Sequence, residues 1–189
     1  MSSSNTSQTA LIVIDLQRGF FEKDSLAAEA GRVVSNANAL MRQAAGRRAP
    51  IFVYRTVHQR DRSTWTLSML DDDQGFNFEG SSQADLMTGL EVPAGSHHLT
   101  KIRDSCFHGT DLAQRLRLLG IRRLLLCGVE AENCLAITGR DAFAHDFIVG
   151  FAVDAIASGQ PERGRRALQD NHTEVRQQLL GLDEVADWW

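Results

Sequence analysis

Residues 124–143 read LLLCGVEAENCLAITGRDAF, and their pattern predicts a strand, a tight turn and a helix in succession. The apolar run Leu124–Cys127 has the length of a strand, Gly128 interrupts it, and a helix-like pattern resumes after several polar residues. In parallel α/β proteins, such a junction lies at the carboxyl end of a strand, where functional sites are built. We therefore expect a site at this turn.

Cys134 lies in this stretch, near the predicted start of the helix. The unpaired N–H groups and the dipole of a helix start favour an anion, and they therefore favour a thiolate over a thiol. Our central hypothesis is that Cys134 is a nucleophile, and the alternative is a purely structural cysteine. Cys127 lies inside the apolar run and is expected to be an inert core residue, whereas Cys106 is ambiguous.

The N-terminal part of the chain has a strand–helix–strand pattern. Residues 10–14 form an apolar run that ends in Asp15, residues 25–47 carry apolar side chains at helical spacing, and residues 51–54 form a second apolar run after Pro50. This order predicts a parallel sheet with a right-handed crossover. It places Asp15 at the carboxyl end of a strand, and a capping role in a loop or helix is the alternative.

The rest of the chain continues this α/β alternation. We expect a short strand near residues 97–103 that carries Lys101, further strands at residues 121–127 and 147–154, and a helix that opens at Pro161. The pattern weakens after residue 171. There it favours an edge strand at residues 173–175 and a terminal helix at residues 179–189.

Residues 55–100 are predicted to form a long ordered excursion, a kind of segment that is often functional where it lies over a site. Trp65, Phe76 and Phe78 are candidate pocket walls, and the alternative is that they pin the excursion to the body of the protein. Gln17 and Phe20 follow the first strand. They are further candidates for contact with a substrate, with a place in the core as the alternative.

Composition and charge restrict the possible functions. With 189 residues, 43% of them hydrophobic and 23% charged, the chain suits one globular domain at residues 9–189 after a flexible tail at residues 1–8. A net charge of −4 gives no reason to expect nucleic acid as a partner, and no uncharged apolar run of about 18 residues indicates a membrane span. Three widely spaced cysteines fit a reduced cytoplasmic compartment better than a disulfide scaffold.

Three separated motifs occur in order along the chain. They are Ile12–Gln17 with Phe20, then Lys101-x-Arg103-x-Ser105-x-Phe107 followed by Thr110-x-Leu112, and then Gly128-Val129-x-x-x-x-Cys134 with Thr138 and Asp141-Ala142. Together they resemble the isochorismatase-like cysteine hydrolase superfamily, which includes nicotinamidases, N-carbamoylsarcosine amidase and isochorismatases. The resemblance covers about residues 9–159. It implies an α/β, three-layer Rossmann-like fold with a central parallel sheet flanked by helices, in a homo-oligomer.

The resemblance also implies a catalytic triad of Asp15, Lys101 and Cys134, and a cis peptide bond between Val129 and Glu130. The backbone N–H groups of Glu130 and Cys134 would then form an oxyanion hole. The chemistry is coherent on its own terms, because Lys101 would favour a thiolate and Asp15 could serve as base and then as acid. We therefore expect a cofactor-independent hydrolase that cleaves a C–N bond of a small amide, carbamoyl or ureido compound through a thioester.

One departure from the superfamily pattern concerns metal binding. Nicotinamidases carry an Asp-x-His metal motif after the second strand, and the corresponding stretch here is Thr56-Val57-His58. The paired His97 and His98 add no second cluster with ligand spacing. We therefore expect no metal.

Other departures leave alternatives open. Ala131 matches isochorismatases rather than amidases, so an isochorismatase-type vinyl ether hydrolase with Asp15 as its acid is the first alternative. A non-catalytic member of the fold that binds a small molecule is the second. Glu130 would suit a cationic or amino-bearing substrate if its side chain pointed inward. If it pointed outward, it would carry no information on specificity.

Overall fold

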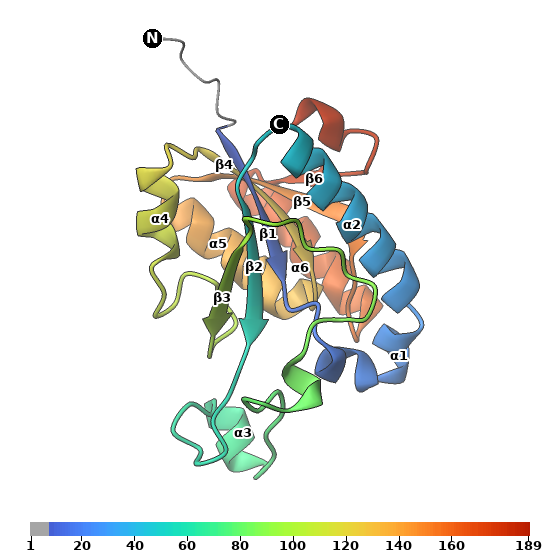
Figure 1. The fold of residues 1–189 in the computed structure, drawn as a ribbon, viewed down its shortest axis with the longest axis vertical. Helices are drawn as coiled ribbons and strands as arrows, with labels where there is room; N and C mark the ends of the chain where they lie inside the picture. Colours follow the sequence, from blue (N-terminus) through green and yellow to red (C-terminus); the bar gives the residue numbers. More distant parts are fainter. Residues whose placement is uncertain (1–7) are drawn as a thin grey trace.

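A computed structural model of the chain describes residues 8–189, in which six parallel strands form one sheet between layers of helices (Figure 1). The sheet order is β3-β2-β1-β4-β5-β6. The strands are β1 (Thr9–Ile14), β2 (Ile51–Thr56), β3 (His97–Lys101), β4 (Arg123–Gly128), β5 (Ile148–Ile156) and β6 (Gln178–Leu180). The helices are α1 (Asp24–Ala27), α2 (Ala30–Gly46), α3 (Leu67–Asp71), α4 (Leu112–Leu118), α5 (Ala136–Ala144) and α6 (Pro161–Val175). The tail expected at residues 1–8 lies, except for Gln8, outside the described residues.

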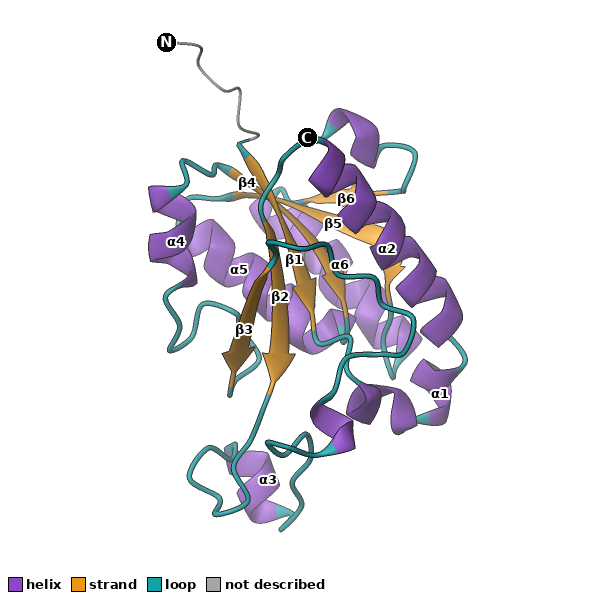
Figure 2. Cartoon of the chain, viewed as in Figure 1, coloured by secondary structure: helices purple, strands orange, loops and turns teal. Residues whose placement is uncertain are grey.

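Both faces of the sheet are covered, which explains why its central strands are apolar throughout. Every residue of β1 is buried, and successive side chains alternate between two separate cores. Ile12 and Ile14 pack with residues of α4, α5 and α6, whereas Leu11 and Val13 pack with residues of α2. Figure 2 shows these helices on opposite sides of the sheet. The predicted three-layer α/β fold is confirmed.

The strand order reverses between β1 and β4, and Gly128 lies at this point. In open parallel sheets, the crevice where the order reverses is the usual position of a ligand site. Gly128 pairs with Ile14, has a φ of 125°, and is followed by Val129, whose N–H donates to the Ile14 carbonyl at 3.0 Å. A Cβ on Gly128 would overlap that carbonyl oxygen. Only glycine therefore lets the ends of β1 and β4 come this close.

The prediction of one continuous helix at residues 25–47 was wrong, because the chain forms two helices there, α1 and α2. The Leu26 N–H donates to the Lys23 carbonyl and the Glu29 N–H donates to the Leu26 carbonyl, at 2.9 and 3.0 Å. These three-residue spacings tighten the chain and end α1 before α2 begins at Ala30.

The predictions for the C-terminal segment were also wrong. Residues 173–175 are the last turn of α6 rather than an edge strand, because the helix continues until Arg176 adopts a left-handed conformation with φ of 57°. The edge strand at this end of the sheet is β6, which begins at Gln178, two residues after Arg176, and pairs with β5. Instead of a terminal helix, residues 179–189 contain the end of β6 and one short 3-10 turn at Val185–Asp187.

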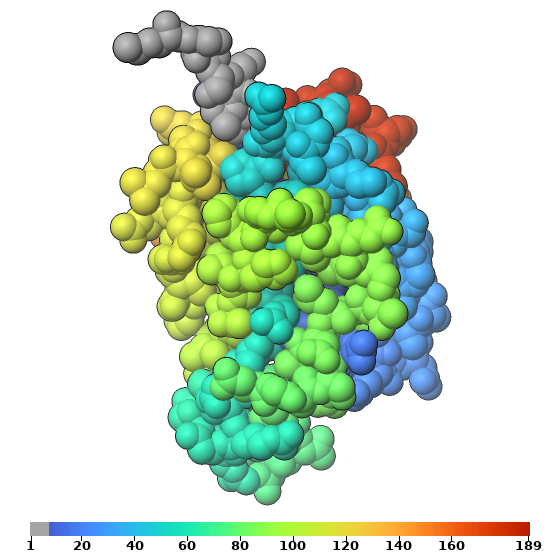
Figure 3. Space-filling model, viewed as in Figure 1, coloured from blue at the N-terminus to red at the C-terminus, as the bar shows by residue number. Residues whose placement is uncertain are grey.

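The excursion at residues 57–96 extends beyond the carboxyl end of β2 and returns along the molecule to β3. It contains α3, and it projects from the body of the protein in the ribbon and space-filling views (Figure 1; Figure 3). One single β-bridge joins His58 to Phe78 within the excursion. A second joins Leu86 of the excursion to Gln17, in the loop after β1. The excursion therefore meets the loop that follows β1. Within residues 8–189, no helix combines the length and apolar character needed to cross a membrane.

Replacing Gly128 by alanine is expected to lower the free energy of unfolding by roughly 2–5 kcal/mol, because both the positive φ and the Ile14 carbonyl oppose a side chain there. Urea unfolding would measure this loss. Gly31→Ala is the matched control, since Gly31 lies in α2 with no heavy atom near its added Cβ, and alanine there should stabilise the helix by up to about 1 kcal/mol. Equal stability of the two variants would contradict the proposed role of Gly128.

Candidate active site

The ends of three elements bring Asp15, Lys101 and Cys134 together. Asp15 follows β1, Lys101 ends β3, and Cys134 lies in a π-helical turn (Ala131–Leu135) between β4 and α5. Lys101 Nζ lies 2.7 Å from Asp15 Oδ2 and 3.3 Å from Cys134 Sγ. The side chains of Asp15 and Lys101 are fully buried, and Cys134 exposes only 5% of its surface. The three residues predicted as a triad are therefore in one buried cluster.

Thr56, at the end of β2, is a fourth member of this cluster that the sequence did not single out as a participant. Its hydroxyl donates to Asp15 Oδ1 at 3.0 Å and accepts from Lys101 Nζ at 2.8 Å. Lys101 also donates to the carbonyl of Arg103 at 3.1 Å. The sequence contained a signal for this role, since Thr56 is a polar residue that ends a buried strand beside β1, as Asp15 does.

The backbone at Asp15 turns its carboxylate into the cluster. Its φ is 56°, a left-handed conformation that aspartate tolerates better than most residues. The Asp15 N–H donates to the Tyr54 carbonyl at 3.0 Å, and its carbonyl accepts from the Gln17 N–H at 2.8 Å. These bonds fix the position of the carboxylate at the carboxyl edge of the sheet.

The electrostatics of the thiol differ from the sequence-based expectation. Burial raises the pKa of the Cys134 thiol well above its ordinary value, the charge of Asp15 raises it further, and Lys101 only partly opposes this. Burial is the largest single effect on Lys101 and lowers its pKa, but its acidic neighbours together, Asp15 first among them, outweigh burial and leave that pKa above its ordinary value. These effects favour the neutral thiol over the thiolate that the sequence led us to expect.

The turn that carries Cys134 begins at a cis peptide bond between Val129 and Glu130, the geometry that the resemblance implied. The Glu130 carbonyl accepts from the N–H groups of Asn133 and Leu135, both at 3.2 Å. The N–H of Ala131 donates to the Ala157 carbonyl at 3.0 Å. These bonds hold the turn against β5. The role of the Glu130 and Cys134 N–H groups as an oxyanion hole stays a prediction.

The side chain of Glu130 has partners within the protein, so neither alternative raised by the sequence describes it fully. Its two carboxylate oxygens accept from Lys23 Nζ at 3.0 Å and from Asn133 Nδ2 at 3.2 Å. Only 8% of the residue is exposed. Glu130 therefore joins the turn that carries Cys134 to the segment between β1 and α1.

The three residues predicted to contact a substrate lie in different environments. The amide of Gln17 is buried, donating to the carbonyls of Thr56 and Ala84 at 2.9 and 3.0 Å and accepting from the Thr56 N–H at 2.8 Å. Its polar atoms therefore hold the loop after β1 to the end of β2. The amide of Gln17 is therefore committed to the main chain. Contact of Gln17 with a substrate stays a prediction.

The aromatic candidates form two contacts beside this cluster. Phe20 meets Phe76 edge to face with ring centroids 5.3 Å apart, and Phe76 lies 6.0 Å from the ring of His58. Trp65 lies 6.0 Å from Phe78 and donates its indole N–H to the Gln59 carbonyl at 2.9 Å. The excursion is therefore tied to the loop after β1 through Phe76. Contact of Phe20 and Trp65 with a substrate stays a prediction.

The residues at the position of the superfamily metal motif do not fit a metal ion. The Thr56 hydroxyl is engaged by Asp15 and Lys101, and His58 Nδ1 lies 3.0 Å from the Thr64 carbonyl. Burial lowers the pKa of His58 below its ordinary value. Across residues 8–189, no three His, Cys, Asp or Glu side chains gather closely enough to hold a metal. No step of the chemistry is therefore assigned to a metal.

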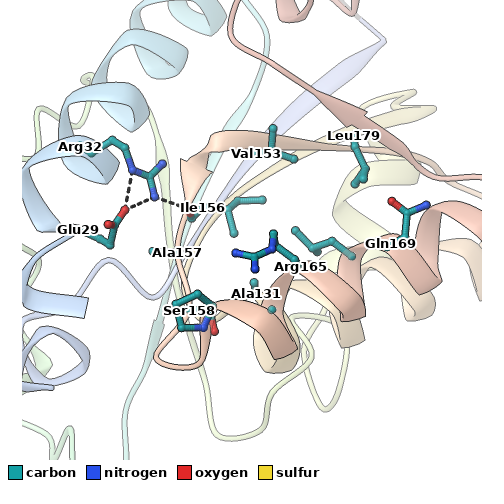
Figure 4. Close-up of a pocket in the computed structure, with 13 residues that line it drawn as sticks. Glu29, Arg32, Ala131, Val153, Ile156, Ala157, Ser158, Arg165, Gln169 and Leu179 are labelled. Carbon is teal, nitrogen blue, oxygen red and sulfur yellow. Dashed lines mark hydrogen bonds and ion pairs between the residues drawn. The ribbon is translucent and has the colours of Figure 1, made fainter. Parts of the chain in front are cut away.

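A cavity of about 560 Å³ lies between α2, β5 and α6, next to the Ala131–Leu135 turn (Figure 4). Ala131 and Ala157 line its floor, and Arg165 points its guanidinium toward the middle. Arg32 stands at its edge with its guanidinium bound to Glu29 and to the Ile156 carbonyl. None of Asp15, Lys101 and Cys134 lines this cavity, so it is separate from the triad.

Comparisons with known proteins show which family and fold the chain is similar to. The isochorismatase domain model matches residues 9–176. A protein of Pseudomonas chlororaphis named "Probable isochorismatase" is 31% identical over 170 residues, which cover 88% of this chain and 80% of that protein. A protein of Arabidopsis thaliana named "Probable inactive nicotinamidase" is 29% identical, with 82% and 83% covered. The solved pyrazinamidase of Pyrococcus horikoshii in complex with zinc has a TM-score of 0.80 at 26% identity, with 93% and 99% covered.

The Cys134 thiol is expected to stay protonated at neutral pH and to ionise only above its ordinary pKa of 9.0, because its raised pKa means that the proton is held to higher pH. The ultraviolet absorbance of thiolate, taken as the difference between the wild type and Cys134→Ala across a pH titration, would measure this. Asp15→Asn should move the titration to lower pH, since it removes a charge that opposes the thiolate. A Cys134 thiolate signal at pH 7 would contradict the expectation.

Proposed function

Because the chain belongs to the isochorismatase family, we propose that it is a hydrolase that cleaves a C–N bond of a small amide, carbamoyl or ureido compound through a Cys134 thioester. One observation carries this proposal: Lys101 Nζ lies within 2.7 Å of the Asp15 carboxylate and 3.3 Å of the Cys134 sulfur, in a buried cluster. A nucleophile and a base that both contact one cation are the parts that amide hydrolysis by a thiol requires.

In the proposed reaction, Asp15 accepts the Cys134 proton as the sulfur attacks the carbonyl carbon of the substrate. The proton is transferred at the moment of attack, which suits a thiol whose resting pKa is raised. The N–H groups of Glu130 and Cys134 stabilise the oxyanion. Asp15 then gives the proton to the leaving nitrogen, and ammonia or an amine departs.

The second half of the reaction removes the acyl group from the sulfur. Asp15 takes a proton from a water molecule, the resulting hydroxide attacks the thioester carbonyl, and Cys134 leaves as a thiolate that regains the proton. Lys101 stays charged throughout, because the pKa of its ammonium is raised beside Asp15. It stabilises the anionic sulfur at 3.3 Å and keeps the carboxylate oriented together with Thr56.

A vinyl ether hydrolase with Asp15 as its acid is the second candidate, because one relative at 31% identity is named "Probable isochorismatase". Such a reaction needs a proton donor and no thiol. The third possibility, a non-catalytic binding protein, follows from the relative named "Probable inactive nicotinamidase". The intact cluster of Asp15, Lys101 and Cys134 favours catalysis, since binding alone requires no such cluster.

We further propose that the protein works in a reducing compartment, the cytoplasm, as a homo-oligomer. The thiol mechanism needs Cys134 reduced, and all three cysteines in the described residues are free. Phe143 and Ile148 expose 53% and 54% of their surface and line a common surface hollow, which favours association between copies. Light scattering of the purified protein would give the mass of a single chain if the oligomer proposal were wrong.

Cys134→Ala is expected to reduce hydrolysis of the proposed substrates by roughly 10³-fold or more, because the acceptor of the acyl group is lost. A panel of small amides, carbamoyl and ureido compounds with detection of released ammonia or amine would measure this. Cys127→Ala is the matched control, since Cys127 is a buried cysteine of β4 outside the cluster, and it should retain turnover.

The same variants separate the candidate functions. Vinyl ether hydrolysis would survive Cys134→Ala and be lost in Asp15→Asn, whereas amide hydrolysis should be lost in both. Thermal unfolding of each variant would show whether the fold is intact. Amide turnover that persists in a folded Cys134→Ala protein would rule out the thioester mechanism.

A further inference from the structure

Asp104 is a second carboxylate beside the thiol, and the proposed reaction does not use it. It lies in the loop after β3, and its Oδ1 is 3.9 Å from Cys134 Sγ. Unlike Asp15 and Lys101, Asp104 is exposed to solvent. Asp104 is therefore a solvent-exposed carboxylate in contact with the buried sulfur.

The cationic groups near Asp104 are engaged elsewhere. Lys101 is buried in its ion pair with Asp15. Arg103 directs its guanidinium to the carbonyls of Thr64 and Ile102, at 2.8 and 2.6 Å. His58 is buried, and its lowered pKa leaves the ring neutral at pH 7. Asp104 has no ion-pair partner among these groups.

Arg103 keeps its charge but directs its guanidinium to two carbonyls, and within residues 8–189 no cation forms a salt bridge with Asp104. Asp15 and Lys101 carry opposite charges in contact, so their combined effect on an approaching molecule is small. The pKa of the thiol reflects the same balance, since both Asp15 and Asp104 raise it and Lys101 lowers it. A single uncompensated charge at the mouth of a site attracts ligands of the opposite sign and repels those of the same sign.

We propose that Asp104 is a specificity residue that selects substrates carrying a positive charge, such as an ammonium or guanidinium group, close to the scissile carbonyl. This inference rests on the proposed function, because it assumes that the reacting carbonyl is positioned at the Cys134 sulfur. It deepens that function by naming the substrate class as amides, carbamoyl or ureido compounds of cationic molecules. Substrates with a carboxylate at the same place are disfavoured.

The test compares the reaction of Cys134 with three methanethiosulfonate reagents of similar size, one cationic (aminoethyl), one anionic (sulfonatoethyl) and one neutral (methyl). Each forms a mixed disulfide with the thiol and releases methanesulfinate. Mass spectrometry assigns the labelled cysteine, and each rate is divided by that of 2-mercaptoethanol with the same reagent. Because only ratios between reagents are compared, a variant that changes the pKa of the thiol affects all three reagents alike.

In the wild type, the normalised rate at Cys134 should be about tenfold higher for the cationic than for the anionic reagent at low salt. Asp104→Asn should bring this ratio to within about twofold of one. Asp170→Asn makes the same charge change at an exposed position of α6 and should leave the wild-type ratio unchanged. Added salt should reduce the preference in the wild type.

The outcomes distinguish this inference from the proposed function. A reactive Cys134 with no charge preference, or a preference that survives Asp104→Asn, overturns the role of Asp104 and leaves the thiol mechanism standing. A Cys134 that reacts with none of the three reagents, in a protein that also hydrolyses no amide of the panel, overturns both. If such a protein does hydrolyse amides, equal kcat/KM for cationic and anionic amides overturns the role of Asp104. A preference that is lost in Asp104→Asn and kept in Asp170→Asn supports the assignment.

Discussion

The buried ion pair between Asp15 and Lys101 is the constraint on which the rest of the site depends. Each charge has lost its water, a loss that costs several kcal/mol, and removing one partner of such a pair typically costs about 3–5 kcal/mol. The pair is tolerated because Thr56 and the Arg103 carbonyl supply further hydrogen bonds. Asp15, Thr56 and Lys101 lie at the ends of the neighbouring parallel strands β1, β2 and β3, so the register of these strands must be correct for the charges to be compensated.

The thiol reaches this pair from the other half of the sheet. Cys134 follows β4, which meets β1 where the strand order reverses, and Gly128 permits the close approach of the two strand ends. The thiol therefore lies beside two charges, those of Asp15 and Lys101, that already pair with each other. Burial raises the pKa of the thiol. In the proposed reaction, this makes proton transfer to Asp15 part of the attack itself. On this proposal, the cysteine becomes a nucleophile only when a substrate is in place.

In our proposal, specificity depends on loops outside the sheet and not on the buried cluster of Asp15, Lys101 and Cys134. Relatives named as an isochorismatase and as a nicotinamidase share the fold, so the sheet and its strand ends do not identify a substrate. Several groups of this chain lie outside the sheet, on loops: Phe76 and Trp65 in the excursion, the ion pair of Lys23 and Glu130, and Asp104 in the loop after β3. Loops of this kind change charge and shape at the site without disturbing the buried ion pair.

The sequence by itself determined the layers and the polar strand ends, because buried parallel strands are continuous apolar runs and the residue that ends such a run is visible locally. Asp15 stood out in this way and Cys134 by its place near a predicted helix start, whereas the role of Lys101 was implied by the resemblance to the family. Only the tertiary structure decided that Thr56 joins them, that the Gln17 amide is used by the main chain, and that burial and Asp15 raise the pKa of the thiol. It also decided where α1 ends and where the last edge strand lies. These features depend on burial and on contacts between residues far apart in the chain, which no local pattern encodes.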